Sequence, residues 1–306
     1  MKYISADEIA RLVSYKDIVE ALREGFRADI QTPVRHHHET GLATTLLLMP
    51  AWSAAFTGLK TVTVKTDNAA LGVPTVQGAY LLIDNQTGTP VCMMDGTELT
   101  RRRTACASAL ASDYLSRKDS SVLLIVGAGA LALHFVMAHA AVRPIKTVLI
   151  YNRTPERSHR LMKELHADGF SVEVVTDLQA AMGRADIISG ITSSNTTIVK
   201  GAWLKPGTHV DLAGAFKPTM REVDGDTVAA ARVYVDTREG ALAEAGDLIQ
   251  ARDEGRFDFR DVQGDLFELC RAQVHGRKTE AEITLFKSCG TALEDLAAAT
   301  LVHLRS

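Results

Sequence analysis

A glycine turn between a short apolar run and a helix-favouring stretch constrains the fold of this chain more than any other feature. The run over 122–126, VLLIV, is rich in β-branched residues, and Gly127-Ala128-Gly129 follows it directly. A helix-favouring stretch comes next, and a second β-type run, TVLIY, occupies 147–151. This order predicts a strand, a tight turn, a helix and a second strand, the repeating unit of a doubly wound α/β sheet.

The two glycines predict a binding site for a dinucleotide. Gly127 permits a backbone conformation that residues with a Cβ avoid, and Gly129 lets a pyrophosphate approach the free N–H groups at the helix start. Ala132 occupies the third position of the G-x-G-x-x-G pattern, where alanine still permits close helix–strand packing. The alternative is a tight turn in an α/β core without a ligand. The strand–helix–strand pattern around the turn favours the dinucleotide.

The end of the second strand predicts which dinucleotide is bound. NAD-specific sites carry Asp or Glu about 20 residues after the glycine pattern, where the carboxylate binds the ribose 2′-hydroxyl. Asn152-Arg153-Thr154 stands there instead, and a guanidinium suits charge-assisted bonds to a 2′-phosphate. We therefore expect NADPH as the preferred cofactor and NADH as the lesser one. The alternative is that Arg153 only ends the strand in solvent.

Composition and spacing limit the other functional classes. At 306 residues the chain has the length of about two domains, and its net charge of −3 gives no reason to expect nucleic-acid or anionic-membrane binding. The four cysteines are scattered without metal-ligand spacing, and the histidines at 36–38 point alternately to opposite faces if they lie on a strand. We therefore expect free thiols and no metal site. The N-terminus lacks the basic start and apolar run of a signal peptide, which favours a cytoplasmic location.

Local patterns predict two kinds of architecture along the chain. Residues 5–27 are predicted to form one helix that Ser5 caps, residues 33–100 a largely antiparallel sheet, and residues 98–117 a helix. From residue 118 onward strands and helices alternate, which predicts a Rossmann-type doubly wound sheet in addition to an α+β domain. The further predicted elements are helices over 155–167, 178–182, 239–252 and 291–303 and strands over 172–175, 186–190, 209–213, 233–236 and 283–287.

Three cations in the first third of the chain are candidate site residues. Lys60 lies in the apolar strand pattern GLKTVTV, Arg35 in TPVRHHH, and Arg103 ends a cluster of three arginines. A cation at a core-facing strand position is costly unless it is paired. The alternative for Lys60 is a charge at a strand edge. For Arg101 and Arg102 we expect a solvated helix face.

Several motifs resemble those of the ornithine cyclodeaminase/μ-crystallin family in both order and spacing. They are GLKTVTVKTDN, GVPTVQGAYLLIDNQTGTPVCMMDGTELTRRRTACASALAS, VGAGALA, YNRT, DLAGAFKPTMREVD and ITLFKSCGTALED, which together span nearly the whole chain. The resemblance implies a homodimer with a substrate-binding and dimerisation domain over 1–117, to which the C-terminal helix at 289–306 returns. It also implies a Rossmann NADP-binding domain over 118–288. Family members include ornithine cyclodeaminase, alanine dehydrogenase and ketimine reductases.

The resemblance assigns roles to individual residues. Arg35 matches the arginine that binds the substrate carboxylate, and Lys60 matches the lysine that contacts the substrate and supports proton transfer. Arg103 and Thr104 match an Arg-Thr pair that reaches the substrate site and the cofactor. The other positions that match cofactor contacts are Thr75, Gly127, Gly129, Ala130, Leu131, Asn152, Arg153, Thr154, Thr192, Ser193 and Ser288.

Phe216 departs from the family pattern. Cyclodeaminase and alanine dehydrogenase members have an aspartate at this place, which serves steps that release or handle ammonia. Phenylalanine cannot act as a general acid or base, so this position argues against both activities. An apolar wall suits a flat cyclic imine, and Phe216 is therefore predicted to contact the substrate.

These observations predict NAD(P)H-dependent reduction of a cyclic imino acid with Lys60 as the proton source. The expected substrates are Δ1-pyrroline-2-carboxylate, Δ1-piperideine-2-carboxylate or both, and the products are L-proline and L-pipecolate. The alternatives are ornithine cyclodeaminase, alanine dehydrogenase, and a non-enzymatic protein that holds NADPH and a small hydrophobic acid. The expected partners are the small-molecule substrate and a second copy of the chain.

Replacing Arg153 with alanine tests the cofactor prediction. Arg153→Ala removes the group that is expected to bind the 2′-phosphate, so the KM for NADPH should rise about tenfold or more while the KM for NADH changes little. Steady-state kinetics with each coenzyme measure the two constants. An equal rise in both would contradict the assignment.

Overall fold

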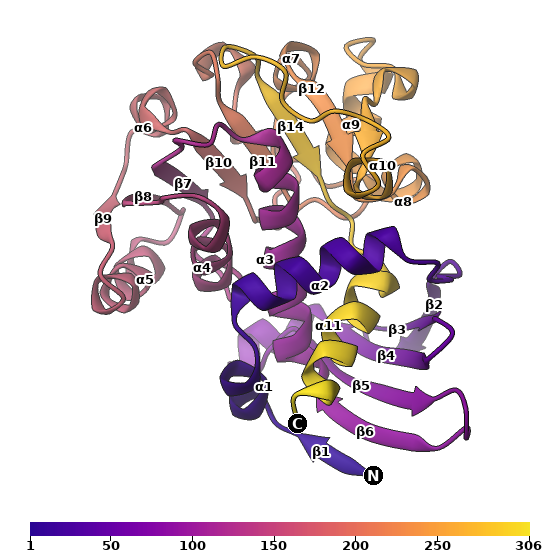
Figure 1. Ribbon diagram of the computed structural model, residues 1–306. Helices are drawn as coiled ribbons and strands as arrows, with labels where there is room; N and C mark the ends of the chain where they lie inside the picture. The colour runs from indigo at the N-terminus through magenta and orange to yellow at the C-terminus, as the bar shows by residue number, and fades with distance from the viewer. The chain divides into compact units, whose positions relative to one another are not determined.

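The computed structural model describes the backbone of residues 1–306 and the side chains of all of them except Thr66 and Ala69. The chain forms two compact units (Figure 1). The first unit comprises residues 1–104 and 291–306, and the second unit comprises residues 105–290. The division falls within helix α3 (Gly96–Leu115), earlier in the chain than the predicted boundary after residue 117.

A six-stranded sheet forms the centre of the first unit. Its strand order is β1-β6-β5-β4-β3-β2, and every neighbouring pair is antiparallel except β1 with β6. The predicted, largely antiparallel sheet is therefore confirmed, whereas β1 was not predicted. The strands are β1 (Lys2–Ile4), β2 (His36–Gly41), β3 (Thr44–Trp52), β4 (Phe56–Lys65), β5 (Val76–Asp84) and β6 (Pro90–Asp95).

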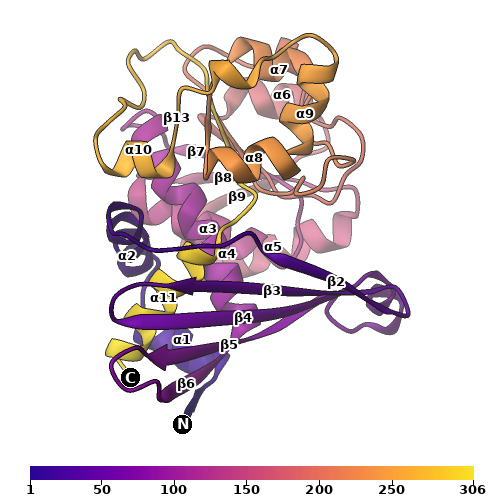
Figure 2. The same cartoon turned by 90° about the vertical axis from the view of Figure 1, so that its right-hand side faces the viewer.

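The C-terminal helix α11 (Ala292–Leu304) packs on one face of this sheet, against β3, β4 and β5. Side chains of β4 alternate between the two faces, so that Gly58, Lys60 and Val62 are buried on the α11 side. Phe56 on the same face stacks edge-on against His303 of α11, with 5.6 Å between ring centroids. Figure 2 shows α11 behind the strands and, among the residues that the structure describes, no helix of the first unit over the other face.

The single helix predicted over 5–27 is wrong, because the structure has two helices there. α1 (Ala6–Leu12) begins with the predicted cap, in which Ser5 accepts a hydrogen bond from the N–H of Glu8. Val13 is extended, with φ −135° and ψ 131°, and α2 (Tyr15–Arg27) begins after it. The break follows from a second capping box, since Ser14 and Asp17 satisfy each other's backbone N–H groups.

The second unit is built on an eight-stranded sheet in which all neighbouring strands are parallel. Its order is β13-β12-β14-β11-β10-β7-β8-β9, which confirms the predicted doubly wound sheet. The chain runs outward from β7 in one direction and resumes on the other side of β7 with β10. The strands are β7 (Val122–Val126), β8 (Thr147–Tyr151), β9 (Ser171–Val174), β10 (Ile187–Gly190), β11 (His209–Leu212), β12 (Arg232–Val235), β13 (Gly264–Asp265) and β14 (Thr284–Lys287).

The predicted helices of the second unit are present except in one region, whereas the helices over 225–230 and 266–270 were not predicted. The predicted helix over 239–252 is divided at Ala245, whose ψ of 84° is not helical. Gly246 follows, and a Cβ there would lie 2.1 Å from the carbonyl oxygen of Met220, so a close backbone approach occupies this place. The helices are α4 (Ala132–Val142), α5 (Pro155–Ala167), α6 (Leu178–Arg184), α7 (Gly225–Ala230), α8 (Arg238–Glu244), α9 (Gly246–Asp253) and α10 (Leu266–Cys270). Among all described residues, no helix has the length and apolar character that crossing a membrane requires.

Candidate active site

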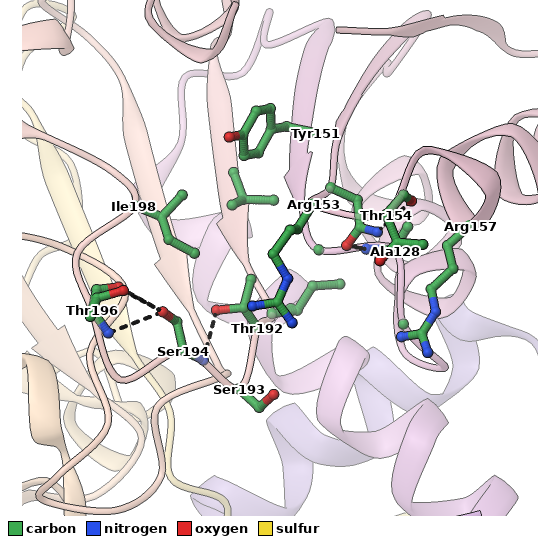
Figure 3. Close-up of a pocket in the computed structure, with 15 residues that line it drawn as sticks. Ala128, Tyr151, Arg153, Thr154, Arg157, Thr192, Ser193, Ser194, Thr196 and Ile198 are labelled. Carbon is green, nitrogen blue, oxygen red and sulfur yellow. Dashed lines mark hydrogen bonds between the residues drawn. The ribbon is translucent and has the colours of Figure 1, made fainter. Parts of the chain in front are cut away.

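A pocket of about 360 Å³ lies in the second unit, where the strand order reverses between β7 and β10 (Figure 3). Ligands of open α/β sheets bind at such a switch point, beyond the carboxyl ends of the strands. The turns that follow β7, β8 and β10 supply most of the lining. The lining residues that were predicted as cofactor contacts are Gly127, Gly129, Asn152, Arg153, Thr154, Thr192 and Ser193.

The glycine turn has the conformation that the sequence predicts. Gly127 has φ +112°, and a Cβ on it would lie 3.0 Å from Cγ2 of Thr192 and 3.1 Å from the carbonyl oxygen of Ile191. Gly129 faces open space, with no neighbouring atom within 4 Å of its missing Cβ. The turn therefore leaves room for a ligand directly before α4, as a pyrophosphate at the helix start requires.

The segment after β8 connects the glycine turn to two guanidinium groups. Asn152 accepts a hydrogen bond from the N–H of Ala128 (3.1 Å) and donates one to the carbonyl of Thr154 (2.8 Å). Arg153 and Arg157 are exposed and line the pocket. Arg157 was not predicted, although its place in the first turn of the helix after Asn152-Arg153-Thr154 could have indicated it. The pocket thus offers two cations for an anionic group.

The buried carboxylate of Glu222 holds the turn after β10, which lines the pocket on the side opposite Arg153 and Arg157. Glu222 accepts hydrogen bonds from the N–H (2.6 Å) and hydroxyl (2.8 Å) of Thr192, and from the N–H groups of Gly214 (2.9 Å) and Ala215 (3.2 Å). Burial raises the pKa of Glu222 to about 7, against the opposing charge of Lys287. The turn after β10 is in this way tied to the turn after β11. Glu222 was not among the predicted site residues, because nothing local in the sequence distinguishes it from a solvated acid.

Other predicted residues of the second unit lie outside the lining of this pocket. Ala130 and Leu131 precede α4, and Phe216 follows β11 with 39% of its surface exposed. Ser288 is buried and donates a hydrogen bond to Asp236 (3.1 Å). Their predicted contacts with cofactor or substrate therefore stay predictions.

In the first unit, Lys60 belongs to a buried network of charges. Its Nζ lies 2.7 Å from Oδ2 of Asp295, and Nε of Arg103 lies 2.8 Å from Oδ1 of the same carboxylate. Arg103 also forms an ion pair with Glu294 through Nη1. Lys60 is 1% exposed on an interior strand, and Asp295 and Glu294 are fully buried. The alternative of a strand-edge charge at Lys60 is therefore wrong, and the requirement for a partner is met.

The network changes the acidity of its cations. Burial and the charges of Arg103 and Arg35 together lower the pKa of Lys60 to about 8, against the raising effect of Asp295. Burial also disfavours the charged form of Arg103, but Asp295 and Glu294 outweigh this and raise its pKa. Lys60 can consequently release a proton near neutral pH.

Asp295 and Glu294 were not among the predicted site residues. A possible signal was present, because two adjacent acids interrupt an otherwise apolar, alanine-rich helix in TALEDLAAAT. Acids on such a helix need cationic partners when the helix is buried. The sequence gives no indication that the partners stand far away in the chain, at positions 60 and 103.

Two further expectations concern the arginine cluster and the remaining first-unit residues. Arg102 is buried, donates to Glu98 (2.6 Å) and lies 4.8 Å above the ring of Tyr15, so the expected solvated position is wrong.

Thr75 and Thr104 are half-buried in the first unit. The histidines at 36–38 are exposed on β2, and the described residues contain no group of three or more potential metal ligands.

The fold and the pocket of the second unit define a Rossmann-type protein with a dinucleotide site. The chain belongs to the ornithine cyclodeaminase/mu-crystallin family, whose model matches residues 3–306.

Three relatives extend over nearly the entire chain. It is 39% identical to a Δ1-pyrroline-2-carboxylate reductase of Paracoccus denitrificans, over 98% of this chain and 96% of the relative. Its structure resembles that of the Thermococcus litoralis Δ1-pyrroline-2-carboxylate reductase in complex with NADH and L-proline, with TM-score 0.95, 33% identity and coverage of 100% and 97% of the two chains. It also resembles an archaeal alanine dehydrogenase dimer with bound NAD, with TM-score 0.93, 30% identity and coverage of 100% and 95%.

Substitution of Gly127 tests the role of the glycine turn. Gly127→Ala places a Cβ at positive φ and against Thr192, so we expect the affinity for NADPH to fall about tenfold or more. Gly169→Ala is the matched control, because Gly169 has φ +86° but nothing within 4 Å of its missing Cβ and lies outside the pocket lining. Fluorescence titration with NADPH measures both variants. Equal affinities in the two would show that the turn does not hold the dinucleotide.

Proposed function

We propose that this protein reduces cyclic 2-imino acids with a nicotinamide dinucleotide. The expected reactions convert Δ1-pyrroline-2-carboxylate to L-proline and Δ1-piperideine-2-carboxylate to L-pipecolate. The observation that carries the proposal is the buried Lys60, whose pKa is lowered to about 8 among Arg103, Arg35 and Asp295. The Δ1-pyrroline-2-carboxylate reductases among its relatives support the same reaction.

The charge of the first-unit network fits a substrate with one carboxylate. Arg103 is already engaged with Asp295 and Glu294. Arg35 is half-buried, and its charge acts on Lys60, which places it in the same electrostatic environment. We assign the binding of the substrate carboxylate to Arg35. Arg103 contributes positive charge and, because its ion pairs hold it in place, a fixed surface for the substrate.

Lys60 supplies the proton that the reaction requires. Reduction of a C=N bond adds a hydride to carbon and a proton to nitrogen, and a protonated imine is the better hydride acceptor. A group with a pKa near the working pH transfers protons efficiently, and the Lys60 ammonium meets this condition. The dinucleotide, when bound, supplies the hydride. The turn conformation at Gly127 and the open space at Gly129 fit its pyrophosphate.

Phe216 separates this proposal from its two enzymatic alternatives. Ornithine cyclodeaminase and alanine dehydrogenase release or handle ammonia, and the family resemblance places an acid at this position in both. A phenyl ring offers no proton to such steps. The similarity to the archaeal alanine dehydrogenase keeps that alternative open to experiment. A protein that only holds NADPH and a small acid is the third alternative, and it predicts binding without turnover.

NADPH is the proposed cofactor in preference to NADH. Arg153 and Arg157 line the pocket together, and the end of β8 carries no carboxylate for a ribose 2′-hydroxyl. The solved relatives were studied with NADH or NAD, so the preference is a property proposed for this chain. The remaining proposed cofactor contacts are Thr75, Arg103, Thr104, Ala130, Leu131, Thr192, Ser193 and Ser288.

We also propose a homodimer of this chain in the cytoplasm, with a role in proline metabolism. The face of the first-unit sheet opposite α11 carries exposed aromatic rings, with Tyr3 58% and Trp52 41% exposed. An uncovered apolar sheet face is a common site of association. A similar solved structure is described as a dimer.

Replacing Lys60 with methionine tests the mechanism. Lys60→Met removes the proton source at similar volume, so kcat should fall about 100-fold or more. Lys65→Met is the matched control, because Lys65 ends the same strand and bonds to the carbonyl of Leu42 outside the network. Absorbance of NADPH is followed with each cyclic imino acid and with pyruvate plus ammonia. Near-normal turnover by Lys60→Met would remove Lys60 from the mechanism, and the absence of turnover by wild type with any cyclic imino acid would remove the proposed function.

A further inference from the structure

We infer that Asp295 is a positioning residue of the reaction, whose carboxylate fixes the Lys60 ammonium for proton transfer by holding it together with Arg103. This inference rests on the proposed function, in which Lys60 protonates the imine. Asp295 lies in the first turn of α11, far from Lys60 in sequence and in direct contact with it in the first unit.

The two oxygens of Asp295 hold two different cations. Oδ2 lies 2.7 Å from Nζ of Lys60, and Oδ1 lies 2.8 Å from Nε of Arg103. Lys60 cannot turn away from Asp295 without losing this partner for its buried charge, which is strongly unfavourable. Asp295 is fully buried, so water does not take over this role. The carboxylate therefore restricts the lysine amine to one direction, as a proton donor requires.

The first turn of α11 is a favourable place for these carboxylates. Thr291 precedes the helix and accepts a hydrogen bond from the N–H of Leu293 (3.4 Å). Negative charge near a helix N-terminus is stabilised by the helix dipole. Glu294 and Asp295 both lie in this turn, but Glu294 forms its ion pair with Arg103, whereas Asp295 bridges Arg103 and Lys60.

The groups that face Lys60 predict the direction of the effect. Asp295 comes from α11, Arg103 from α3, Arg35 from the segment before β2, and Tyr80 from the opposite position on β5. Burial raises the pKa of Tyr80, so its hydroxyl stays neutral. Without the Asp295 charge, the effects of burial, Arg103 and Arg35 on Lys60 are no longer opposed by this carboxylate, and the pKa of Lys60 falls below about 8. The protonated amine is the donor, so kcat should then decline at lower pH than in wild type.

Asp295→Asn and Glu294→Gln form a matched pair of variants. Each replaces one buried carboxylate on the same helical turn with its amide, and each leaves Arg103 with one fewer charged partner. We expect the alkaline decline of kcat with Δ1-pyrroline-2-carboxylate to move to lower pH by about one unit or more in Asp295→Asn. In Glu294→Gln we expect the KM for the imino acid to rise while the midpoint of that decline stays in place.

A titration without substrate separates this inference from the proposed function. Lysine labelled with ¹³C at Cε reports the Lys60 amine, which is identified by the signal missing from Lys60→Met. A lower midpoint in Asp295→Asn supports the coupling even if wild type reduces no cyclic imine, an outcome that would reject only the proposed function. An unchanged Lys60 midpoint and an unchanged pH profile in folded Asp295→Asn would overturn the inference.

Asp295→Glu keeps the test decisive if Asp295→Asn fails to fold. This variant retains the charge but moves the carboxylate by one methylene group. We expect the Lys60 titration to remain near its wild-type midpoint while kcat falls about tenfold or more, because the direction of the amine changes. A purely structural role would leave kcat of the folded variant at the wild-type value, and that result would also overturn the inference.

Discussion

The contact between Lys60 and Asp295 is the interaction on which the rest of the first unit depends. A lysine on an interior strand is tolerated only with a buried partner, and that partner stands on the last helix of the chain. Helix α11 must therefore return to the sheet of the N-terminal residues, where it packs on β3, β4 and β5. The same carboxylate also engages Arg103, so one helical turn fixes two of the three cations of the proposed substrate site.

In the second unit, backbone groups at the centre of a buried sheet are exposed to a ligand. The reversal of strand order beside β7 opens the pocket, and Gly127 turns the chain at a place where a Cβ would lie only 3.0 Å from Cγ2 of Thr192. Glu222 joins the turns after β10 and β11 from behind, through bonds to Thr192, Gly214 and Ala215. A ligand in this pocket thus meets walls that are already in place, which lowers the entropy cost of binding.

The sequence predicted those features that local physics determines. The glycine turn, the alternating strands and helices, the cap at Ser5 and the antiparallel sheet follow from spacing and from backbone preferences, and the structure confirms them. The predictions that the structure contradicts have physical reasons as well. The division at Ala245 depends on a close approach of Gly246 to Met220, and the burial of Arg102 depends on packing against distant residues.

The candidate site was predictable only in part for the same reason. Lys60 was identifiable because an apolar strand pattern makes a cation conspicuous, and the need for a partner followed from its burial. The identity of that partner did not follow, since Asp295 and Lys60 are joined by tertiary packing and by no sequence period. Glu222 was missed likewise, because its hydrogen bonds reach two turns that only the fold brings together.

We propose that this protein, with Lys60 as proton donor and with no acid at position 216, reduces a carbon–nitrogen double bond and does not expel ammonia. The most direct measurement compares two rates of the purified protein: NADPH oxidation with Δ1-pyrroline-2-carboxylate, and ammonia release from L-ornithine in the presence of NAD. We predict rapid oxidation of NADPH and no ammonia above the protein-free control. Ammonia release at a rate that rivals imine reduction would show the claim to be wrong.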